Sequence, residues 1–340
     1  MALTHKERMR KAIRYEQVDR FPTQVNYTSS MGAKLAGYYG VSLEDLPRRL
    51  DNHMIRIDLS YPTRQSADGR VKYDWWGVGF STEEEGYFTS FNPITDSKKL
   101  DDFVWPDPHG PHLLDEAQQI IQSDGSEHFI TCNLGFCLFE RAWALRGYET
   151  FLMDIVLDTK FAEQLLDRIC HIQLSLIERF IDAGVDGGYF GDDYGAQKNM
   201  LISPKSWRQL IKPRLERLFA PFLEAGLPVL MHSDGQIANI LPDMVNIGLT
   251  ALNPVQPEVI SHEWLKDTFG NNLAYYGGVS TQSVLPHGSP KDVREAVSAC
   301  VKTLSSENTG LVISPSHRVM TDIPMENMDA LLEAFTTINE

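Results

Sequence analysis

The sequence predicts an α/β fold, a (β/α)8 TIM barrel that carries an N-terminal extension and a loop and hairpin insertion. Two observations lead to this fold class. From residue 128 onward short apolar runs alternate with helical patterns, which is typical of a parallel sheet with helices outside it. No Gly-x-Gly-x-x-Gly follows any of these runs, and this disfavours the alternative, a doubly wound dinucleotide-binding sheet.

The N-terminal part of the chain departs from the regular pattern. Thr4 and Glu7 have the spacing of a capping box, which predicts a short helix at the start of the chain. Residues 21–27 indicate a strand, and residues 43–58 a helical stretch. Pro, Gly, Asp and Trp crowd together in residues 61–110, so we expect a hairpin and loop insertion there, near the barrel mouth.

The rest of the chain supplies the repeating units. We expect strands at 128–134, 188–191, 228–231, 251–255, 273–277 and 311–314. We expect helices at 159–183, 203–225, 235–247, 261–269, 289–305 and 325–338. With the strand at 21–27 there are seven strands, and an eighth is expected within 51–100. A barrel needs roughly 250 residues, so residues 1–340 are predicted to form one domain with insertions.

Composition narrows the function classes. There are 31 Lys and Arg against 46 Asp and Glu, a formal net charge of -15. An acidic surface repels phosphate backbones and anionic lipids, so neither nucleic acid nor a membrane is an expected partner. No apolar run approaches the ~18 residues of a membrane span. The four cysteines include no Cys-x-x-Cys pair, which is typical of a cytoplasmic protein.

Polar side chains follow most of the predicted strands. In a barrel the active site lies at the C-terminal ends of the strands, so we expect these side chains to share one mouth. They are Asn26, Asn133, Asp192, Asp193, His232, Asp234, Asn253, Gln256, Ser280 and Ser314–His317. We expect substrate to be bound by five residues of the strand segments and their ends, namely Asn26, Asn133, Asn253, Gln256 and Tyr276.

The strongest local motif is His232-Ser-Asp234 at the end of an apolar run. In an extended segment residues i and i+2 point the same way, so both side chains can meet one ion. Imidazole with carboxylate suits zinc or another divalent metal. The alternative is that Asp234 caps a helix from residue 235 and His232 hydrogen-bonds to it. Spacing alone slightly favours that alternative.

Two further groups follow strands near this motif. His317 lies just past the last strand and is either a third ligand or a histidine that contacts substrate or braces a loop. Asp192, Asp193 and Tyr194 are candidate catalytic residues, because adjacent acids at a strand end can carry acid–base chemistry. We expect one of the two acids to cap a turn instead.

Several longer segments resemble the uroporphyrinogen decarboxylase superfamily, in the same order along nearly the whole chain. They are LTHKERMRKAIRYEQVDRFP, CNLGFCLFERAWALRGYETFLMDI, GDDYGAQKNMLISPKSWRQLIKPRLERLF and the closing SPSH…DIPMENM. The resemblance implies a (β/α)8 barrel and one of two activities. True decarboxylases carry an arginine-rich stretch near the N-terminus that grips the substrate's carboxylates, whereas this chain has no arginine between Arg20 and Arg48.

The other branch, the cobamide-linked methyltransferases, is the closer resemblance. Its members bind zinc through a His-x-Cys at a strand end and a distant Cys, ten residues before the Asn of a Pro-x-Glu-Asn motif. By this resemblance His232 is the histidine, Asp234 replaces the first cysteine, and His317 stands ten residues before Asn327. The resemblance therefore implies one zinc site made of His232, Asp234 and His317, with Glu258 or Asp193 open as a fourth ligand.

Ligand type suggests the direction of the reaction. His and Asp ligands leave a harder, more Lewis-acidic zinc than thiolates do, and such a zinc suits the oxygen of a methyl ether. We therefore expect transfer of a methyl group from a small donor to a corrinoid. The chain contains no Asp-x-His-x-x-Gly, so the corrinoid is expected on a separate protein that docks over the mouth. A thiol-accepting methyltransferase, a porphyrinogen-type decarboxylase and a non-catalytic tetrapyrrole binder are the alternatives.

Overall fold

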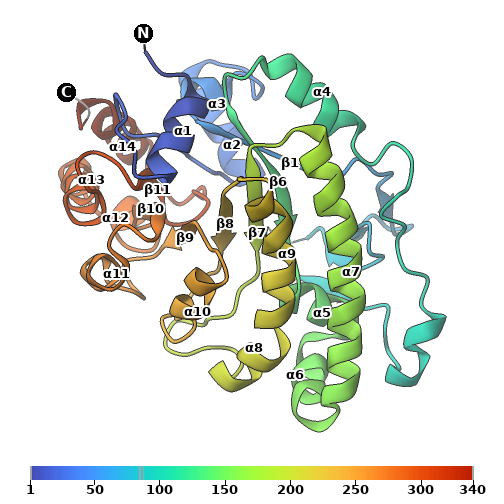
Figure 1. Cartoon of the computed structure of the whole chain (residues 1–340). Helices are drawn as coiled ribbons and strands as arrows, with labels where there is room; N and C mark the ends of the chain where they lie inside the picture. The colour runs from blue at the N-terminus through green and yellow to red at the C-terminus, as the bar shows by residue number, and fades with distance from the viewer. Residues whose placement is uncertain (1, 84–85, 87, 339–340) are drawn as a thin grey trace.

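A computed structural model describes residues 2–83, 86 and 88–338 of the chain. A seven-stranded sheet runs through its centre in the order β1-β6-β7-β8-β9-β10-β11 (Figure 1). The strands are β1 (Met54–Ile57), β6 (Phe129–Gly135), β7 (Gly187–Gly191), β8 (Val229–His232), β9 (Ala251–Val255), β10 (Ala274–Val279) and β11 (Leu311–Pro315). Every neighbouring pair is parallel and the order follows the sequence, so each crossover adds the next strand to the same edge of a curled sheet. The predicted α/β class and parallel sheet are confirmed.

The segment predicted as the first strand lies between the two edges of this sheet. Thr23 bridges to Ile313 of β11 in the parallel sense, and Tyr27 bridges to Val319. On the other side the His53 N–H donates to the Thr23 carbonyl oxygen at 3.1 Å. Residues 21–27 are thus extended, but they form isolated bridges rather than a continuous strand.

Helices cover the outside of the sheet. They are α2 (Ser29–Tyr39), α3 (Leu46–Arg49), α4 (Asp115–Asp124), α5 (Phe139–Arg146), α6 (Tyr148–Leu157), α7 (Thr159–Ala183), α8 (Pro204–Leu210), α9 (Lys212–Glu224), α10 (Leu241–Asn246), α11 (His262–Phe269), α12 (Val284–His287), α13 (Pro290–Leu304) and α14 (Met325–Thr337). In the described residues no helix combines the length and the apolar composition that a membrane span requires.

Three helix predictions need correction. The stretch 203–225 is two helices, since Pro213 cannot continue the hydrogen bonding of α8 and instead sits in the first turn of α9. The stretch 235–247 is helical only in α10, because Gly235 turns the chain with φ +79°. The stretch 43–58 holds only the short α3, after which β1 begins at Met54. That strand lies within 51–100, where the eighth strand was expected.

The insertion at 61–110 forms a small antiparallel sheet beside the main one. Its strands are β2 (Arg64–Gln65), β3 (Val71–Tyr73), β4 (Gly79–Ser81) and β5 (Thr89–Phe91), followed by a 3-10 helix, η1 (Ser97–Asp102). Trp76 and Val78 of the insertion are buried in the same apolar cluster as the helices around the main sheet. An ion pair between Asp74 and Arg141 of α5, both largely buried, fixes the insertion against the helices around the main sheet.

The interior of the curled sheet is closed at one end by the N-terminal helix, α1 (His5–Ile13), which lies across the sheet in Figure 1. Thr4 caps this helix with the predicted capping box. Met9 and Ile13 pack against Leu230 and other inward-facing side chains of the strands. The opposite end of the interior is polar and holds the predicted site.

Candidate metal centre

Three side chains predicted as metal ligands lie together at the C-terminal end of the sheet. His232 ends β8, Asp234 lies two residues later, and His317 follows β11. Each offers one ligand atom, and these atoms all lie within 4.8 Å of one another. His317 Nε2 is 3.4 Å from Asp234 Oδ2, and the centroids of the His232 and His317 rings are 5.7 Å apart. The arrangement leaves room for one ion between the three.

The alternative role of Asp234 as a helix cap is contradicted by the fold. The next helix, α10, begins at Leu241, well after Asp234. His232 does not bond to Asp234 either, since its Nδ1 is paired with Asn253. The Asp234 carboxylate is therefore directed by its loop and by His317, and it takes no part in a helix terminus.

Two glycines let the loops after β7 and β8 cross in contact. A Cβ on Gly195 would lie 2.5 Å from Gln236 N, and a Cβ on Gly235 would lie 2.5 Å from the Gly195 carbonyl carbon. Gln236 N donates to the Ala196 carbonyl oxygen at 2.8 Å across the same crossing. This close approach places Asp193, on the first loop, against the backbone of Asp234, on the second.

Asn253 of β9 fixes the orientation of the His232 ring. Its Nδ2 donates to the Tyr276 carbonyl oxygen at 2.9 Å, and a carbonyl oxygen can only accept. Asn253 Oδ1 must therefore face His232, and it accepts from His232 Nδ1 at 2.7 Å and from the Tyr189 hydroxyl at 2.6 Å. His232 keeps the lone pair on Nε2 for a ligand, as metal-binding histidines do.

The electrostatics of the centre favour a cation. Asp193 Oδ1 accepts from the Asp234 N–H at 2.8 Å and lies 3.9 Å from His232 Nε2. Burial, together with the nearby Asp193 carboxylate, raises the pKa of Asp234, while His232 and His317 lower it. Two imidazoles and a carboxylate are a donor set that zinc binds in proteins, and these residues fit it.

Asp192 and Tyr194, both predicted as catalytic, are fully buried. Asp192 accepts from the backbone N–H groups of Phe139 and Glu140 at 2.7 Å and from Leu138 at 3.2 Å, so it caps the start of α5. The Tyr194 hydroxyl donates to the same carboxylate at 2.9 Å. These contacts favour a positioning role for Asp192 and Tyr194 and leave Asp193 as the acid at the mouth.

Glu140 is a candidate that the sequence did not single out. Burial raises the pKa of its carboxyl well above the usual range, and the Asp193 and Asp192 carboxylates add to this effect. It is brought close to Asp193 because Asp192 anchors the start of α5 beside the loop after β7. No local pattern signals such a contact, since Glu140 is an ordinary first-turn acid of a helix.

The residues predicted to bind substrate occupy two regions of the mouth. Asn26 donates to the hydroxyl of the buried Tyr276 at 2.9 Å, so these two brace each other. Asn133 donates to Asp58 at 2.7 Å at the ends of β6 and β1. Gln256 is 8% exposed and, among the described residues, its Oε1 has no hydrogen-bond partner. It lines a cavity of about 270 Å³ together with Asp234 and His317. Asn253, by contrast, serves His232.

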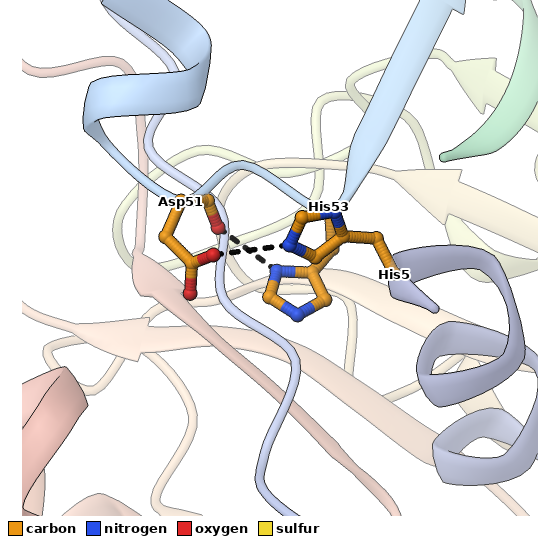
Figure 2. Close-up of side chains that lie close together, drawn as sticks. All are labelled: His5, Asp51 and His53. Carbon is orange, nitrogen blue, oxygen red and sulfur yellow. Dashed lines mark hydrogen bonds and ion pairs between the residues drawn. The ribbon is translucent and has the colours of Figure 1, made fainter. Parts of the chain in front are cut away.

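A second group of possible ligands, His5, Asp51 and His53, lies where β1 begins, at the other end of the interior (Figure 2). Arg8 Nη1 is 3.1 Å from His53 Nε2, and His53 Nδ1 donates to the Asp51 carbonyl oxygen at 2.8 Å. Arg20 forms an ion pair with the Asp51 carboxylate. Burial lowers the pKa of His53 to about 3, so the ring is neutral. Two guanidinium groups oppose a divalent cation here, and the group is a structural network.

Comparisons with known proteins agree with this fold. The sequence profile of the uroporphyrinogen decarboxylase (URO-D) family matches residues 76–338. No curated protein matches the sequence. Among solved structures, a methyltransferase from Methanosarcina mazei has a TM-score of 0.75 at 20% identity, covering 99% of this chain and 100% of its own. A B12-independent methionine synthase from Shewanella sp. W3-18-1 has a TM-score of 0.51 at 9% identity, covering 94% and 95%. At these identities the likeness concerns the fold.

Proposed function

This chain belongs to the uroporphyrinogen decarboxylase family, and on that premise we propose that it is a zinc-dependent methyltransferase. It moves a methyl group from a small donor, such as a methyl ether, to a corrinoid carried by a separate protein. The observation that carries the proposal is the convergence of His232, Asp234 and His317 within 4.8 Å, with the His232 ring oriented by Asn253. The structural likeness to a methyltransferase supports the same branch of the family.

His232, Asp234 and His317 would hold the zinc, which when bound acts as a Lewis acid toward the ether oxygen. Asp193 lies next to this centre, and Glu140 interacts with Asp193. Burial and the neighbouring Asp193 and Asp192 carboxylates raise the pKa of Glu140 well above its usual range, which favours its protonated form. It is the group proposed to protonate the departing oxygen.

The proposed reaction balances in the following way. The bond between the methyl carbon and the oxygen breaks, and its electron pair stays on the oxygen. That oxygen takes the proton from Glu140, and the product is an alcohol or phenol. The methyl group passes to the reduced corrinoid, which supplies the electron pair of the new bond.

The proposal includes two features of the surroundings. Residues 21–27 are proposed to act as the eighth extended segment, which closes the sheet into a barrel. Their hydrogen bonds to β11 and to His53 support this closure. The corrinoid protein is taken to dock over the polar mouth beside the insertion at 61–110. The docking proposal follows from the mouth being the end of the interior that α1 does not fill.

Decarboxylation is the second candidate, favoured by one observation. Arg56 lies inside the sheet, with its guanidinium 4.8 Å from the Tyr189 ring and 3.4 Å from Asn26 Oδ1. Arg56 supplies a cation that the N-terminal segment lacks, and a substrate carboxylate would bind there. In this case no zinc is required for turnover.

A methyl-transfer assay separates the two candidates. Zinc-loaded protein is mixed anaerobically with free cob(I)alamin and methoxybenzene, and the absorbance change of methylated cobalamin is followed. We expect transfer with the wild-type chain and none with His232→Ala. Undiminished transfer in that variant, or metal-independent decarboxylation of added uroporphyrinogen, would overturn the proposal.

A further inference from the structure

The insertion and the barrel enclose a second, larger cavity of about 1030 Å³. It lies between β3 and β4 of the small sheet, the ends of β1 and β6, and Leu176 and Phe180 of α7. A cavity of this size is at the upper end of the range that binds small molecules and cofactors. It is separate from the 270 Å³ cavity that Asp234 and His317 line.

Aromatic rings form much of the wall of this cavity. Trp75 and Trp76 meet edge to face, with centroids 5.5 Å apart, and Phe80 meets Phe136 in the same way at 5.9 Å. The first three rings come from the insertion, whereas Phe136 belongs to the loop between β6 and α5. Such rings offer apolar faces and edges on which another flat ring can stack.

The Nε–H of Arg141, in the wall of this cavity, has no hydrogen-bond acceptor among the described residues. Arg141 is 7% exposed, and its guanidinium lies 5.1 Å from the Trp76 ring and 5.5 Å from the Phe136 ring. One of its terminal nitrogens donates to Asp74, but its Nε has no hydrogen-bond partner among the described residues. A buried N–H without an acceptor costs about 1–3 kcal/mol, so a ligand oxygen at this point would be favoured.

The charges lining the cavity disfavour an anionic ligand, since Arg141 and Lys72 face four carboxylates. Asp74 already neutralises the guanidinium, and Asp58 adds another carboxylate to the cavity wall. A carboxylate on the ligand would meet more negative than positive charge here. An uncharged ether or phenol oxygen can accept from the Arg141 Nε without that penalty.

One wall of the cavity lies two strands away from His232 of the candidate metal centre. Gly135 lines it, and Gly135 is in register with Gly191 of β7, which is in register with His232 of β8. Adjacent strands are ~4.8 Å apart, so Gly135 and His232 are about 10 Å apart along the sheet. A benzene ring with a methoxy group can extend over most of that separation.

We propose that this cavity binds an uncharged aryl methyl ether. The ring lies among Trp75, Trp76 and Phe136, and an oxygen of the ligand accepts from the Arg141 Nε. Binding of such a ligand does not depend on the proposed function. Its role as the methyl donor does rest on that function.

Calorimetric titration of the zinc-loaded full chain with 1,2-dimethoxybenzene tests the binding. Trp75→Leu, which removes a half-buried ring, and Arg141→Lys, which keeps the cation for Asp74 but removes the Nε, should each weaken the affinity at least tenfold. The matched control is Trp264→Leu on α11, outside the cavity, and it should bind like the wild type. Tetramethylammonium and benzoate should bind more weakly than the ether.

Three results would overturn this inference: no binding of the ether, equal affinity in all the variants, or tighter binding of tetramethylammonium. The assay with cob(I)alamin separates it from the proposed function. If the ether binds and Trp75→Leu weakens it, yet no methyl group is transferred, the proposed function fails and the binding site stands. If the methyl group is transferred and the rate is the same in Trp75→Leu, the proposed function stands and the proposed binding site fails.

Discussion

The Nδ1 of His232 donates to the Oδ1 of Asn253 across 2.7 Å, and this bond decides which ring nitrogen faces the barrel mouth. Asn253 cannot turn its amide over, because its Nδ2 is held by the Tyr276 carbonyl oxygen. Hydrogen bonds inside the curled sheet, from Tyr276 through Asn253, thus set the tautomer of His232 at the end of β8.

Removing this support should weaken metal binding without removing a ligand. Asn253→Leu is expected to lower zinc affinity roughly 10- to 100-fold, the usual effect of losing such a partner. Competition with a chromophoric chelator measures the affinity. Tyr189→Phe is the control, since it removes the other bond to Asn253 Oδ1 and leaves that to His232. Equal zinc affinity in Asn253→Leu and the wild type would contradict the assigned orientation.

The location of the metal can be checked by elemental mass spectrometry. Wild-type protein should carry near-stoichiometric zinc, and His232→Ala should lose it. His112→Ala, at an exposed histidine, and His5→Gln, in the network of Figure 2, should both retain it. Loss of zinc from His5→Gln, with retention in His232→Ala, would place the ion at the other end of the curled sheet.

A side chain should not fit at Gly195 or Gly235, where the loops after β7 and β8 cross in contact. Gly195→Ala and Gly235→Ala each press a methyl group against backbone, so we expect a loss of about 1–3 kcal/mol in the free energy of unfolding together with weaker zinc binding. Gly37→Ala is the matched control: it lies in α2 with open space around it, and should gain about 0.5–1 kcal/mol. Urea unfolding measures all three. Unchanged zinc affinity in both crossing variants would show that Asp193 and Asp234 are positioned independently.

Stability should fall as the pH is lowered from about 6.5. Burial lowers the pKa of His53 to about 3, so below the ordinary histidine pKa the unfolded chain binds a proton that the folded chain does not. The pKa of Asp19 is lowered by its hydrogen bonds to Arg8, which adds a loss in the same direction at lower pH. Unfolding free energies between pH 7 and pH 4 report the slope. His53→Gln should flatten it, and an unchanged slope would exclude His53 as a source.

Much of the fold follows from local patterns. The helix at 159–183 was predicted with the same limits as α7, because a long apolar period ends at Gly184, which adopts the left-handed cap. The segment of β1 was predicted as part of a helix, because Leu50, Met54 and Ile57 repeat at the spacing of one helix face. Only the turn at Asp51, with φ 54°, breaks that pattern, and a positive φ at Asp cannot be recognised from the sequence.

The candidate centre could be predicted only in part. The expected gathering of strand ends placed His232 and Asp234 near the mouth with His317, which lies much later in the chain, and only the family resemblance implied that the three form one site. The roles of Asp192 and Glu140 depend on where α5 begins relative to the loop after β7, which is a tertiary relationship. The crossing of Gly195 and Gly235 is likewise invisible until both loops are folded.

The contacts between α1 and the last strand of the sheet have a consequence for synthesis on the ribosome. The Ala12 carbonyl oxygen accepts from Gly310 N and from Thr309 Oγ1, so the first helix rests on the last strand of the sheet. A nascent chain that has not yet released β11 lacks these two hydrogen bonds, and Met9 and Ile13 lack Val312 of β11 as a packing partner. The contacts of α1 with the sheet are therefore complete only near the end of translation.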